Sequence, residues 1–460
     1  MKDDSPNAAV ALDELIAAKM TAQNVVGLAV AIVNKAGETL YQGCFGCRDK
    51  AKSLPLDPET LMGIASVTKS FTALAIMQLC QRGAVDVNAP VSDYIPSFTM
   101  PGVSVGHLLS HSGGIFPQPR TLLTDVARDM ALDPARDGDF ALLPALADEG
   151  ERRVAEKLSA QARFIGRPGE YMSYSNDGFA LLSSVVKRRG GERTYPEYVG
   201  KYIHAPLGMT RSTFEFSLSS RENVTTLYRR APGGALGETN DFTDDAFVLS
   251  GCGGMKSTLN DMKKYLCMYL NHGRTPSGEQ VALPFSIKEM CRPHSASGPN
   301  AYYGYGLRIG SMDDMRVVSH GGGFVGVSSY IEFSHEAGIG AVALSNTSGA
   351  GCGDITGAAM RLFKNTGTRW SDAFIDRVCG KYISHESGAE ATEIIRRGDK
   401  LVVLAGGARL EATPINSYML SAQSARGRML LTVYSDDGGK VWAIGVNSRI
   451  IPRSEGEVIL

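Results

Sequence analysis

The sequence predicts an α+β fold: an antiparallel sheet flanked by helices as an α/β sandwich, an all-helical subdomain, and a small C-terminal antiparallel β domain. Three observations lead to this prediction. Strand-like segments near the N-terminus return at residues 302–347, whereas the segments between them have helical spacing of apolar residues. After about residue 370 the pattern changes to short alternating segments. We therefore expect two domains, residues 1–370 and 371–460.

Periodicity and end signals predict the individual elements in order. A helix over residues 9–23 precedes two strands, 25–34 and 38–47, which a tight turn joins as a hairpin. Further helices are expected at 66–82, 120–165 (a helical subdomain or lid), 176–189 and 257–271, and strands at 303–309, 315–319, 327–333 and 339–345. Short strands near 392–396, 400–404, 408–412, 417–421, 428–434 and 440–446 predict the β domain or barrel.

Composition and charge exclude several classes of protein. Hydrophobic residues make up 43% of the 460 residues, which is enough to fill a sizeable core and excludes a wholly disordered chain. Lys plus Arg is 47 and Asp plus Glu is 48, so the balanced charge argues against a nucleic-acid partner. No apolar run approaches the roughly 18 residues of a membrane span. The start Met1-Lys2-Asp3-Asp4 does not resemble a secretory signal, so we expect a cytoplasmic protein unless a signal has been removed.

Cysteine usage fits that expectation. The eight cysteines are scattered along the chain, and free thiols are expected in a long chain without a signal. Cys44 and Cys47 form a Cys-x-x-Cys pair, which in other proteins serves redox chemistry or half of a zinc site. This pair lies in a strand-like stretch, and the chain contains no second Cys-x-x-Cys pair to complete a zinc site. We therefore expect neither redox chemistry nor metal binding from it.

The first motif that carries chemistry is Ser66-Val67-Thr68-Lys69, at the start of a predicted helix. Residues three apart share a helix face, so the Lys69 amine can reach the Ser66 hydroxyl. The helix N-terminus offers backbone N–H groups to an oxyanion and disfavours a charged lysine, which favours a neutral base. Taken alone, the pattern is more often a capping serine beside a solvated lysine.

Two further motifs follow at long intervals. Tyr174-Ser175-Asn176 precedes an apolar helix; its phenol can exchange a proton and its amide can bind a carbonyl, although a surface turn has the same composition. His320-Gly321-Gly322-Gly323 directly follows a predicted strand, where glycines allow a substrate close to the backbone. The alternative is a glycine-rich hairpin. The His320–Gly323 motif is not a phosphate-binding loop, because no Gly-Lys-Ser/Thr follows it.

In this order and spacing, the three motifs resemble the serine β-lactamase and penicillin-binding-protein superfamily. The similarity is greatest to the class C β-lactamase-related hydrolases, which include D-aminopeptidases, D-amino-acid amidases, alkaline D-peptidases and esterases. It covers about residues 10–365, and further matching stretches lie at 64–70, 107–114, 168–176, 206–210 and 253–258. The β domain at the end resembles the lipocalin-like appendage of some members.

The resemblance implies three catalytic residues. Ser66 matches the nucleophile that becomes acylated, and Lys69 matches the amine beside it. Tyr174 matches the tyrosine that shuttles protons to and from the serine hydroxyl and the leaving group. The sequence leaves open whether Lys69 or Tyr174 is the base for acylation.

The resemblance also implies the substrate-binding residues. Asn176 matches the amide that holds the substrate, and His320 with Gly322 and Gly323 matches the strand motif beside it. The oxyanion hole would use the backbone N–H groups of Ser66 and Gly323. Classical members carry a lysine where this chain has His320, and a histidine is mostly neutral at pH 7. We therefore expect substrates without a carboxylate at that end.

No metal or cofactor is expected. His107 and His111 are four residues apart and could be a metal pair on a helix. The match of this segment to a structural stretch of the superfamily favours a scaffolding role, and no third ligand stands out.

These observations predict a serine hydrolase that works through an acyl-enzyme on amide or ester bonds, most simply a D-aminopeptidase, D-stereospecific peptidase or amidase. The alternatives are an esterase of small esters, a β-lactamase, and a non-catalytic penicillin-recognising scaffold. We expect a small-molecule or short-peptide substrate and neither nucleic acid nor membrane as partner, with a homo-oligomer left open. Loops 115–165 and 215–250 would form the substrate pocket, which carries no readable code.

Overall fold

The chain folds into two compact units in a computed structural model. The described residues are 5–161, 163–218, 220–231, 234–239, 242, 248–313, 315–364, 370–384, 390–398, 400–416, 418–424, 427–436, 439–446 and 449–454. One unit comprises Met1–Ser334 with Ile339–Leu362, and the other His335–Gly338 with Phe363–Leu460. The predicted α+β class with a small C-terminal antiparallel β domain is confirmed. The division at residue 370 stays a prediction, because residues 335–338 group with the second unit and not with the first.

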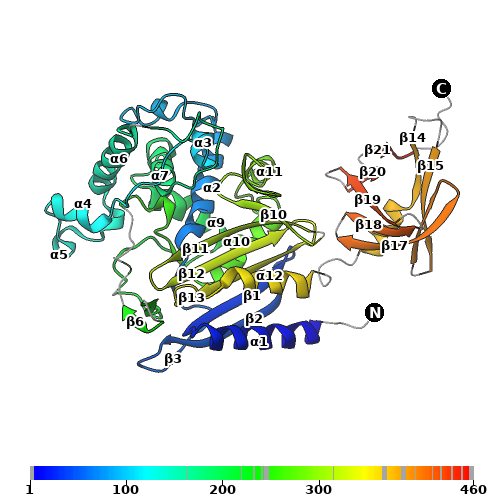
Figure 1. Ribbon diagram of the computed structural model, residues 1–460, viewed down its shortest axis with the longest axis horizontal. Helices are drawn as coiled ribbons and strands as arrows, with labels where there is room; N and C mark the ends of the chain where they lie inside the picture. The colour runs from blue at the N-terminus through cyan, green and yellow to red at the C-terminus, as the bar shows by residue number, and fades with distance from the viewer. Residues whose placement is uncertain are drawn as a thin grey trace. The chain divides into compact units, whose positions relative to one another are not determined.

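The first unit is built on a nine-stranded antiparallel sheet in the order β3-β2-β1-β13-β12-β11-β10-β9-β8 (Figure 1). Its strands are β1 (Gly27–Asn34), β2 (Thr39–Asp49), β3 (Leu54–Pro55), β8 (Ser295–Gly298), β9 (Ala301–Tyr303), β10 (Arg308–Met312), β11 (Met315–Phe324), β12 (Val327–Ser334) and β13 (Ile339–Ser345). Strand β1 pairs with β13, so segments more than 300 residues apart meet inside the sheet. Both strands are almost wholly buried and rich in Val, Ile, Leu and Ala, as strands covered on both faces require.

Helices cover this sheet and form a second layer beyond it (Figure 1). They are α1 (Ser5–Ala22), α2 (Thr68–Gln81), α3 (Val105–Leu109), α4 (Leu123–Asp129), α5 (Pro134–Asp137), α6 (Pro144–Ser159), α7 (Asn176–Gly190), α8 (Tyr195–Val199), α9 (Ala205–Leu207), α10 (Leu259–Leu270), α11 (Pro284–Met290) and α12 (Cys352–Phe363). Helix α10 packs on β1, β12 and β13, and α2 packs against α7. Every residue of α2 from Thr68 to Leu79 is buried, so this helix runs through the interior of the first unit.

Two short antiparallel pairs complete the first unit. Strand β4 (Met62–Gly63) pairs with β7 (Lys256–Ser257), and β5 (Leu227–Arg230) pairs with β6 (Leu236–Thr239). Single turns η1 (Ala65–Val67) and η5 (Ser250–Cys252) lie near the first pair. The remaining short turns are η2 (Val91–Asp93), η3 (Phe140–Leu142) and the π-helical η4 (Gly200–His204).

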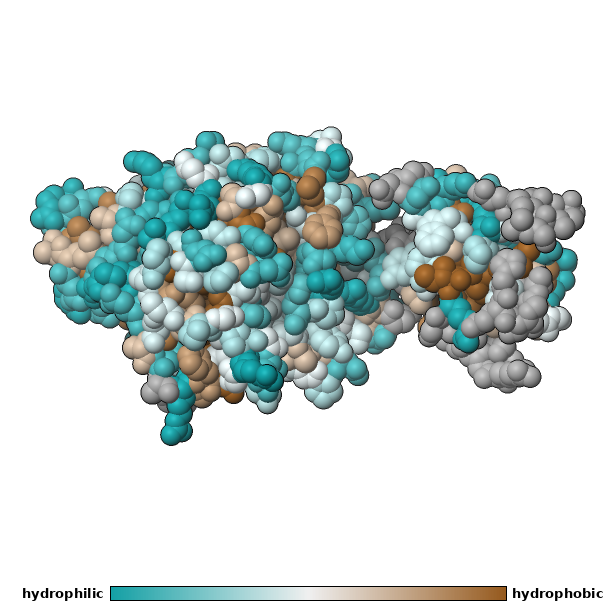
Figure 2. Space-filling model, turned by 90° about the horizontal axis from the view of Figure 1, so that it is seen from above, coloured by the Kyte–Doolittle hydropathy of each residue, from teal (hydrophilic) through white to brown (hydrophobic). Residues whose placement is uncertain are grey.

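The second unit is a short helix, α13 (Asp372–Val378), followed by an eight-stranded antiparallel meander. Its strands are β14 (Gly380–Ser384), β15 (Glu390–Arg397), β16 (Lys400–Ala405), β17 (Ala408–Asn416), β18 (Met419–Ser424), β19 (Gly427–Ser435), β20 (Val441–Val446) and β21 (Arg449–Pro452). A bridge between Tyr382 and Arg453 joins the first strand to the last, which nearly closes a barrel around its own apolar core. The surface of this unit includes the exposed apolar side chains of Leu430, Trp442 and Ile450, and Figure 2 shows apolar surface on it.

Two strand predictions need correction. The expected strand 303–309 is two strands, because the chain turns at Gly304–Leu307, where Gly306 has a φ of +70°. Strand β11 continues to Phe324, so His320–Gly323 lie within the strand and not after it. Glycine is a weak strand former, so the strand pattern in the sequence ends at residue 319. Pairing with β12 extends the strand through the glycines. The terminal strands β14 and β21 were not predicted.

All eight cysteines are free, and Cys44 and Cys47 lie on β2. Among the described residues, no helix is long and apolar enough to cross a bilayer. The described part of the chain also holds no cluster of three His, Cys, Asp or Glu side chains suited to a metal ion.

Candidate active site

A sharp turn presents Ser66 at the entrance to α2. Ala65, directly before it, has a φ of +45°, a left-handed conformation that a residue with a Cβ adopts only at a cost of roughly 1–3 kcal/mol. Thr68 holds the turn: its Oγ1 donates to the Ala65 carbonyl at 2.6 Å and accepts from the Met255 N–H at 3.3 Å. Ser66 itself is partly exposed, whereas its neighbours are buried. The turn therefore aims one hydroxyl out of the core.

Lys69 lies one helical turn further on and is 0% exposed. Its Nζ is 3.0 Å from Ser66 Oγ, 2.8 Å from Asn176 Oδ1 and 2.6 Å from the Cys252 carbonyl oxygen. These three partners, on three separate segments, fix the position of the amine. An amine held beside a serine hydroxyl in this way can take its proton.

Tyr174 and Asn176 reach Lys69 because α7 packs against α2. Ser175 caps α7: its Oγ accepts from the Gly178 N–H at 3.1 Å. Asn176 is then the first helical residue, and Tyr174 lies just outside the helix. The Tyr174 ring centroid is 4.8 Å from Lys69 Nζ, so the structure brings together Ser66, Lys69, Tyr174 and Asn176.

The two histidines of the 107–111 segment have separate structural contacts. His107 forms a reciprocal cap with Ser104 at the start of α3. His111 is buried, its Nδ1 accepts from the Ser175 N–H at 3.1 Å, and its ring centroid is 4.1 Å from that of Tyr174. Burial, and then the nearby Lys69, hold the pKa of His111 well below 6.5. A neutral His111 therefore supports the loop that carries Tyr174.

His320 is also buried, at 1% exposure, and both of its ring nitrogens have partners. Nδ1 lies 2.8 Å from the Gly321 carbonyl and Nε2 lies 2.8 Å from the Tyr303 hydroxyl. Burial, and then Lys69, lower the pKa of His320 to about 3, so the ring is neutral. The resemblance places His320 among the substrate-binding residues, but its ring has no nitrogen left for a substrate, because Gly321 and Tyr303 occupy both. His320 packs instead behind Tyr174, with ring centroids 6.3 Å apart.

The glycines after His320 let β11 approach the Ser66 turn. A Cβ on Gly322 would lie 2.2 Å from the Ile64 carbonyl oxygen and 2.3 Å from Ser329 Oγ, so only glycine fits there. Ser329 Oγ also donates to that carbonyl at 2.7 Å, which ties β12 to the same turn. Gly323 is exposed, and a Cβ there would meet only the Val327 oxygen at 3.8 Å. The pairing of β11 with β10 ends at Ser319, so among the described residues no strand pairs with that edge of β11 at Gly323.

Sequence reasoning missed the backbone carbonyl of Cys252, the third partner of the Lys69 amine. It comes from η5, which Thr72 Oγ1 holds by donating to the Gly251 carbonyl at 2.6 Å. A Cβ on Gly251 would lie 2.5 Å from the Ser183 side chain, so the turn is pressed against α7. The run Gly251-Cys252-Gly253-Gly254 was the available signal, although a carbonyl ligand leaves no signature in side chains.

The antiparallel sheet and the helical layer around this cluster form the β-lactamase fold. The family model described as Beta-lactamase matches residues 12–363, and the chain belongs to that family.

Two curated relatives match part of the chain. Esterase EstB of Burkholderia gladioli is 33% identical over 214 residues, which are 45% of this chain and 51% of that protein. Penicillin-binding protein 4* of Bacillus subtilis (strain 168) is 25% identical over 313 residues, which are 64% of this chain and 62% of that protein. The chain thus spans between half and two thirds of the length of these relatives.

Two solved structures match nearly the whole chain. The octameric penicillin-binding protein homologue from Pyrococcus abyssi has a TM-score of 0.64 and 27% identity, covering 96% of this chain and 98% of that one. SurE has a TM-score of 0.60 and 17% identity, covering 98% of this chain and 100% of that one, which shows a shared fold.

Proposed function

We propose that the protein hydrolyses small amides or esters through an acyl-enzyme formed on Ser66. The observation that carries this proposal is the single amine, Lys69 Nζ, which lies within hydrogen-bond distance of both Ser66 Oγ and Asn176 Oδ1. A buried amine between a partly exposed hydroxyl and an amide suits nucleophilic catalysis better than it suits a purely structural lysine.

In the proposed reaction, Ser66 Oγ attacks the substrate carbonyl while its proton passes to the Lys69–Tyr174 pair. The new C–O bond gives a tetrahedral oxyanion, which the backbone N–H groups of Ser66 and Gly323 stabilise. The bond to the leaving nitrogen or oxygen then breaks, and that atom takes the proton from the same pair. Water repeats the attack on the acyl carbon, releases the acid and restores the Ser66 hydroxyl.

Asn176 and His320 serve this reaction in different ways. The Asn176 Oδ1 atom accepts from Lys69, so its amide nitrogen is the part that can donate to a substrate carbonyl. His320 positions Tyr303 and the wall behind Tyr174. Because that ring is neutral, the strand motif supplies no fixed cation to a substrate carboxylate.

Two substrate classes fit this site. The first is an amide or peptide with a D-residue, which the three motifs indicate by their resemblance to D-aminopeptidases and D-amino-acid amidases. The second is a small ester, favoured by the 33% identity to Esterase EstB. A β-lactam is the poorer candidate, since its carboxylate would find a neutral histidine at the place where classical members carry lysine.

The test is a comparison of three substrates under one set of conditions: D-alanine p-nitroanilide, a p-nitrophenyl ester and a chromogenic cephalosporin. We expect turnover of the anilide, the ester or both, and little of the cephalosporin. A cephalosporin kcat/KM of about 10⁶ M⁻¹s⁻¹, in the range of good enzymes, with the other two inert, would overturn the proposal in favour of a β-lactamase. Inertness of all three, together with no acylation of Ser66, would favour a non-catalytic scaffold.

A further inference from the structure

A pocket in the first unit combines apolar walls with a cation. Four phenylalanines dominate its lining, and Lys256 is the only charged side chain among the described residues that line it. The lining residues are Leu123, Ala141, Phe214, Phe216, Phe242, Ser250, Gly253, Gly254, Lys256 and Phe324.

Three of the residues that line the pocket connect it to segments of the Ser66 cluster. Gly253 directly follows Cys252, whose carbonyl oxygen is 2.6 Å from Lys69 Nζ. Phe324 directly follows Gly323 on β11. Phe242 belongs to the same apolar cluster as Ala65, the residue before Ser66. A substrate with its carbonyl at Ser66 can therefore extend a side group into the pocket.

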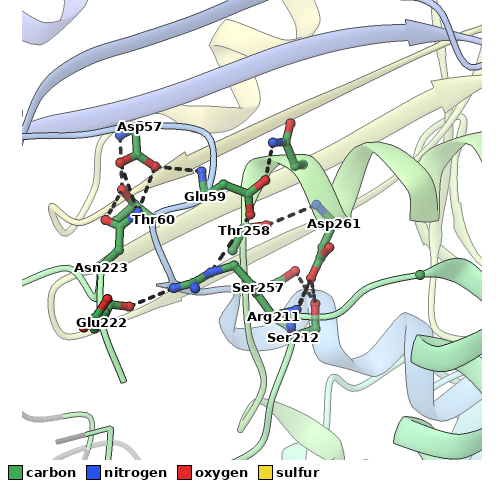
Figure 3. Close-up of polar contacts among 12 residues, drawn as sticks. Asp57, Glu59, Thr60, Arg211, Ser212, Glu222, Asn223, Ser257, Thr258 and Asp261 are labelled. Carbon is green, nitrogen blue, oxygen red and sulfur yellow. Dashed lines mark hydrogen bonds and ion pairs between the residues drawn. The ribbon is translucent and has the colours of Figure 1, made fainter. Parts of the chain in front are cut away.

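Polar contacts fix the wall that carries Phe214 and Phe216. Two backbone N–H groups at its start, those of Arg211 and Ser212, donate to Asp261 Oδ2 at 3.0 Å each (Figure 3). At its end, the Asp139 carboxylate accepts from the Phe216 N–H at 2.8 Å.

The same wall is joined to the strand that carries Lys256. The Lys256 N–H donates to the Thr213 carbonyl at 2.8 Å, and the Thr213 N–H donates to the Lys256 carbonyl at 2.9 Å. The pocket is thus formed before any ligand arrives.

Lys256 is 5% exposed, and its amine has one hydrogen bond among the described residues, to the Glu215 carbonyl oxygen at 2.8 Å. Its Nζ also lies 5.4 Å from the centroid of the Phe242 ring. The two carboxylates that act on it at longer range are engaged elsewhere: Glu215 pairs with Arg221, and Asp139 holds backbone N–H groups. Burial lowers the pKa of Lys256 to about 8, so most of the amine is protonated at pH 7.

A buried ammonium with donors to spare is costly unless an anion pairs with it. We propose that the pocket binds an apolar or aromatic arm of the substrate that ends in a carboxylate, with Lys256 Nζ as the partner of that carboxylate. The phenylalanine rings cover the body of the arm, and the amine selects its end. This inference rests on the proposed function for the position of the reacting carbonyl, and it supplies a cation at a place other than His320.

The experiment measures binding of two matched probes, 3-phenylpropionate and its neutral isostere 3-phenylpropanamide, by isothermal titration calorimetry at pH 7. The full-length wild type, Ser66→Ala, Lys256→Met and Lys288→Met are compared. Lys288 is exposed on α11, so its substitution removes the same charge outside the pocket. We expect the wild type, Ser66→Ala and Lys288→Met to bind the acid about tenfold or more tightly than the amide, as a charged hydrogen bond in a buried site allows. In Lys256→Met the preference should vanish.

Equal binding of acid and amide by the wild type overturns the inference, and so does a preference that survives in Lys256→Met. Should Lys256→Met fail to fold, competition by the two probes against ester hydrolysis in the wild type gives the same comparison without a variant. The proposed function fails separately: in that case Ser66 is not acylated, while the wild type and Ser66→Ala still prefer the acid.

Discussion

Replacing Gly322 by alanine tests how closely β11 must approach the Ser66 turn. The added Cβ would lie 2.2 Å from the Ile64 carbonyl oxygen, and real Cβ contacts essentially never fall under 3.0 Å. The strand and the turn must therefore separate by about 0.8 Å, and Ser329 Oγ, 2.3 Å from the same Cβ, must also move. Overpacking of this kind costs roughly 1–3 kcal/mol of stability. A shift of about 1 Å at a reacting centre can lower the rate on the order of 10²-fold.

The assay compares Gly322→Ala with Gly310→Ala, a control on the neighbouring strand β10 where an added Cβ meets no atom within 4 Å. We expect Gly322→Ala to lower kcat/KM for the best substrate of the panel about 10²-fold and to lower Tm, while Gly310→Ala stays near wild type in both. If Gly322→Ala kept wild-type activity and Tm, the close approach of β11 to the turn would have no part in forming the site.

Three further predictions follow from the same geometry. Tyr174→Phe keeps the ring on His111 but removes the proton carrier, so kcat should fall about 10²-fold or more with KM little changed; a change in KM alone would mean that Tyr174 only lines the pocket. The pKa of His320 is about 3 in the folded state and near 6.5 in the unfolded state, so below pH 6.5 the unfolded chain takes up the proton first. Stability should therefore fall as the pH drops toward 3, with His320 contributing roughly 2 kcal/mol of the loss at pH 5. The buried His111 and His204 contribute to the loss as well, so urea midpoints should show a loss that is smaller by about that amount in His320→Gln than in the wild type; equal losses would contradict the assignment. Deleting residues 371–460 should leave a folded and active first domain with altered substrate range or assembly, since the second unit has its own core, whereas an insoluble or unfolded product would contradict the division.

Much of the fold was predictable because its signals are local. The helix over residues 66–82 and the hairpin of β1 and β2 follow from periodicity, a terminating Gly83 and a short turn. The pairing of β1 with β13 could not be predicted in this way, because the residues of one strand do not identify a distant strand as its partner. The glycine-rich half of β11 was misplaced because its strand conformation comes from β12 and not from its own residues.

The site was predictable only through side chains that carry chemistry. Ser66 and Lys69 share a helix face and could be paired from spacing alone, whereas Tyr174 and Asn176 joined them through resemblance. The role of the Cys252 carbonyl could not be predicted, because every residue has a backbone carbonyl and the sequence does not single out this one. Lys256 was missed because a lysine in a short polar stretch reads as solvated; only the fold buries it among phenylalanines.

The same limit applies to the pocket itself. Its lining includes Leu123 and Ala141 from the expected loop 115–165, and Phe216, Phe242 and Ser250 from the expected loop 215–250. No sequence pattern links these residues. Residues 219, 232–233, 240–241 and 243–247 of the second loop lie outside the described residues.

Covalent labelling of the Ser66 hydroxyl is the most direct test of the central claim. The wild type and Ser66→Ala are treated with a fluorophosphonate, and intact mass and peptide mapping locate the adduct. We predict one adduct per chain on Ser66 Oγ, none in Ser66→Ala, an unchanged Tm in that variant, and a loss of turnover by several orders of magnitude. An adduct on another residue, or a Ser66→Ala protein that keeps more than about a tenth of the activity on every substrate, would contradict the account.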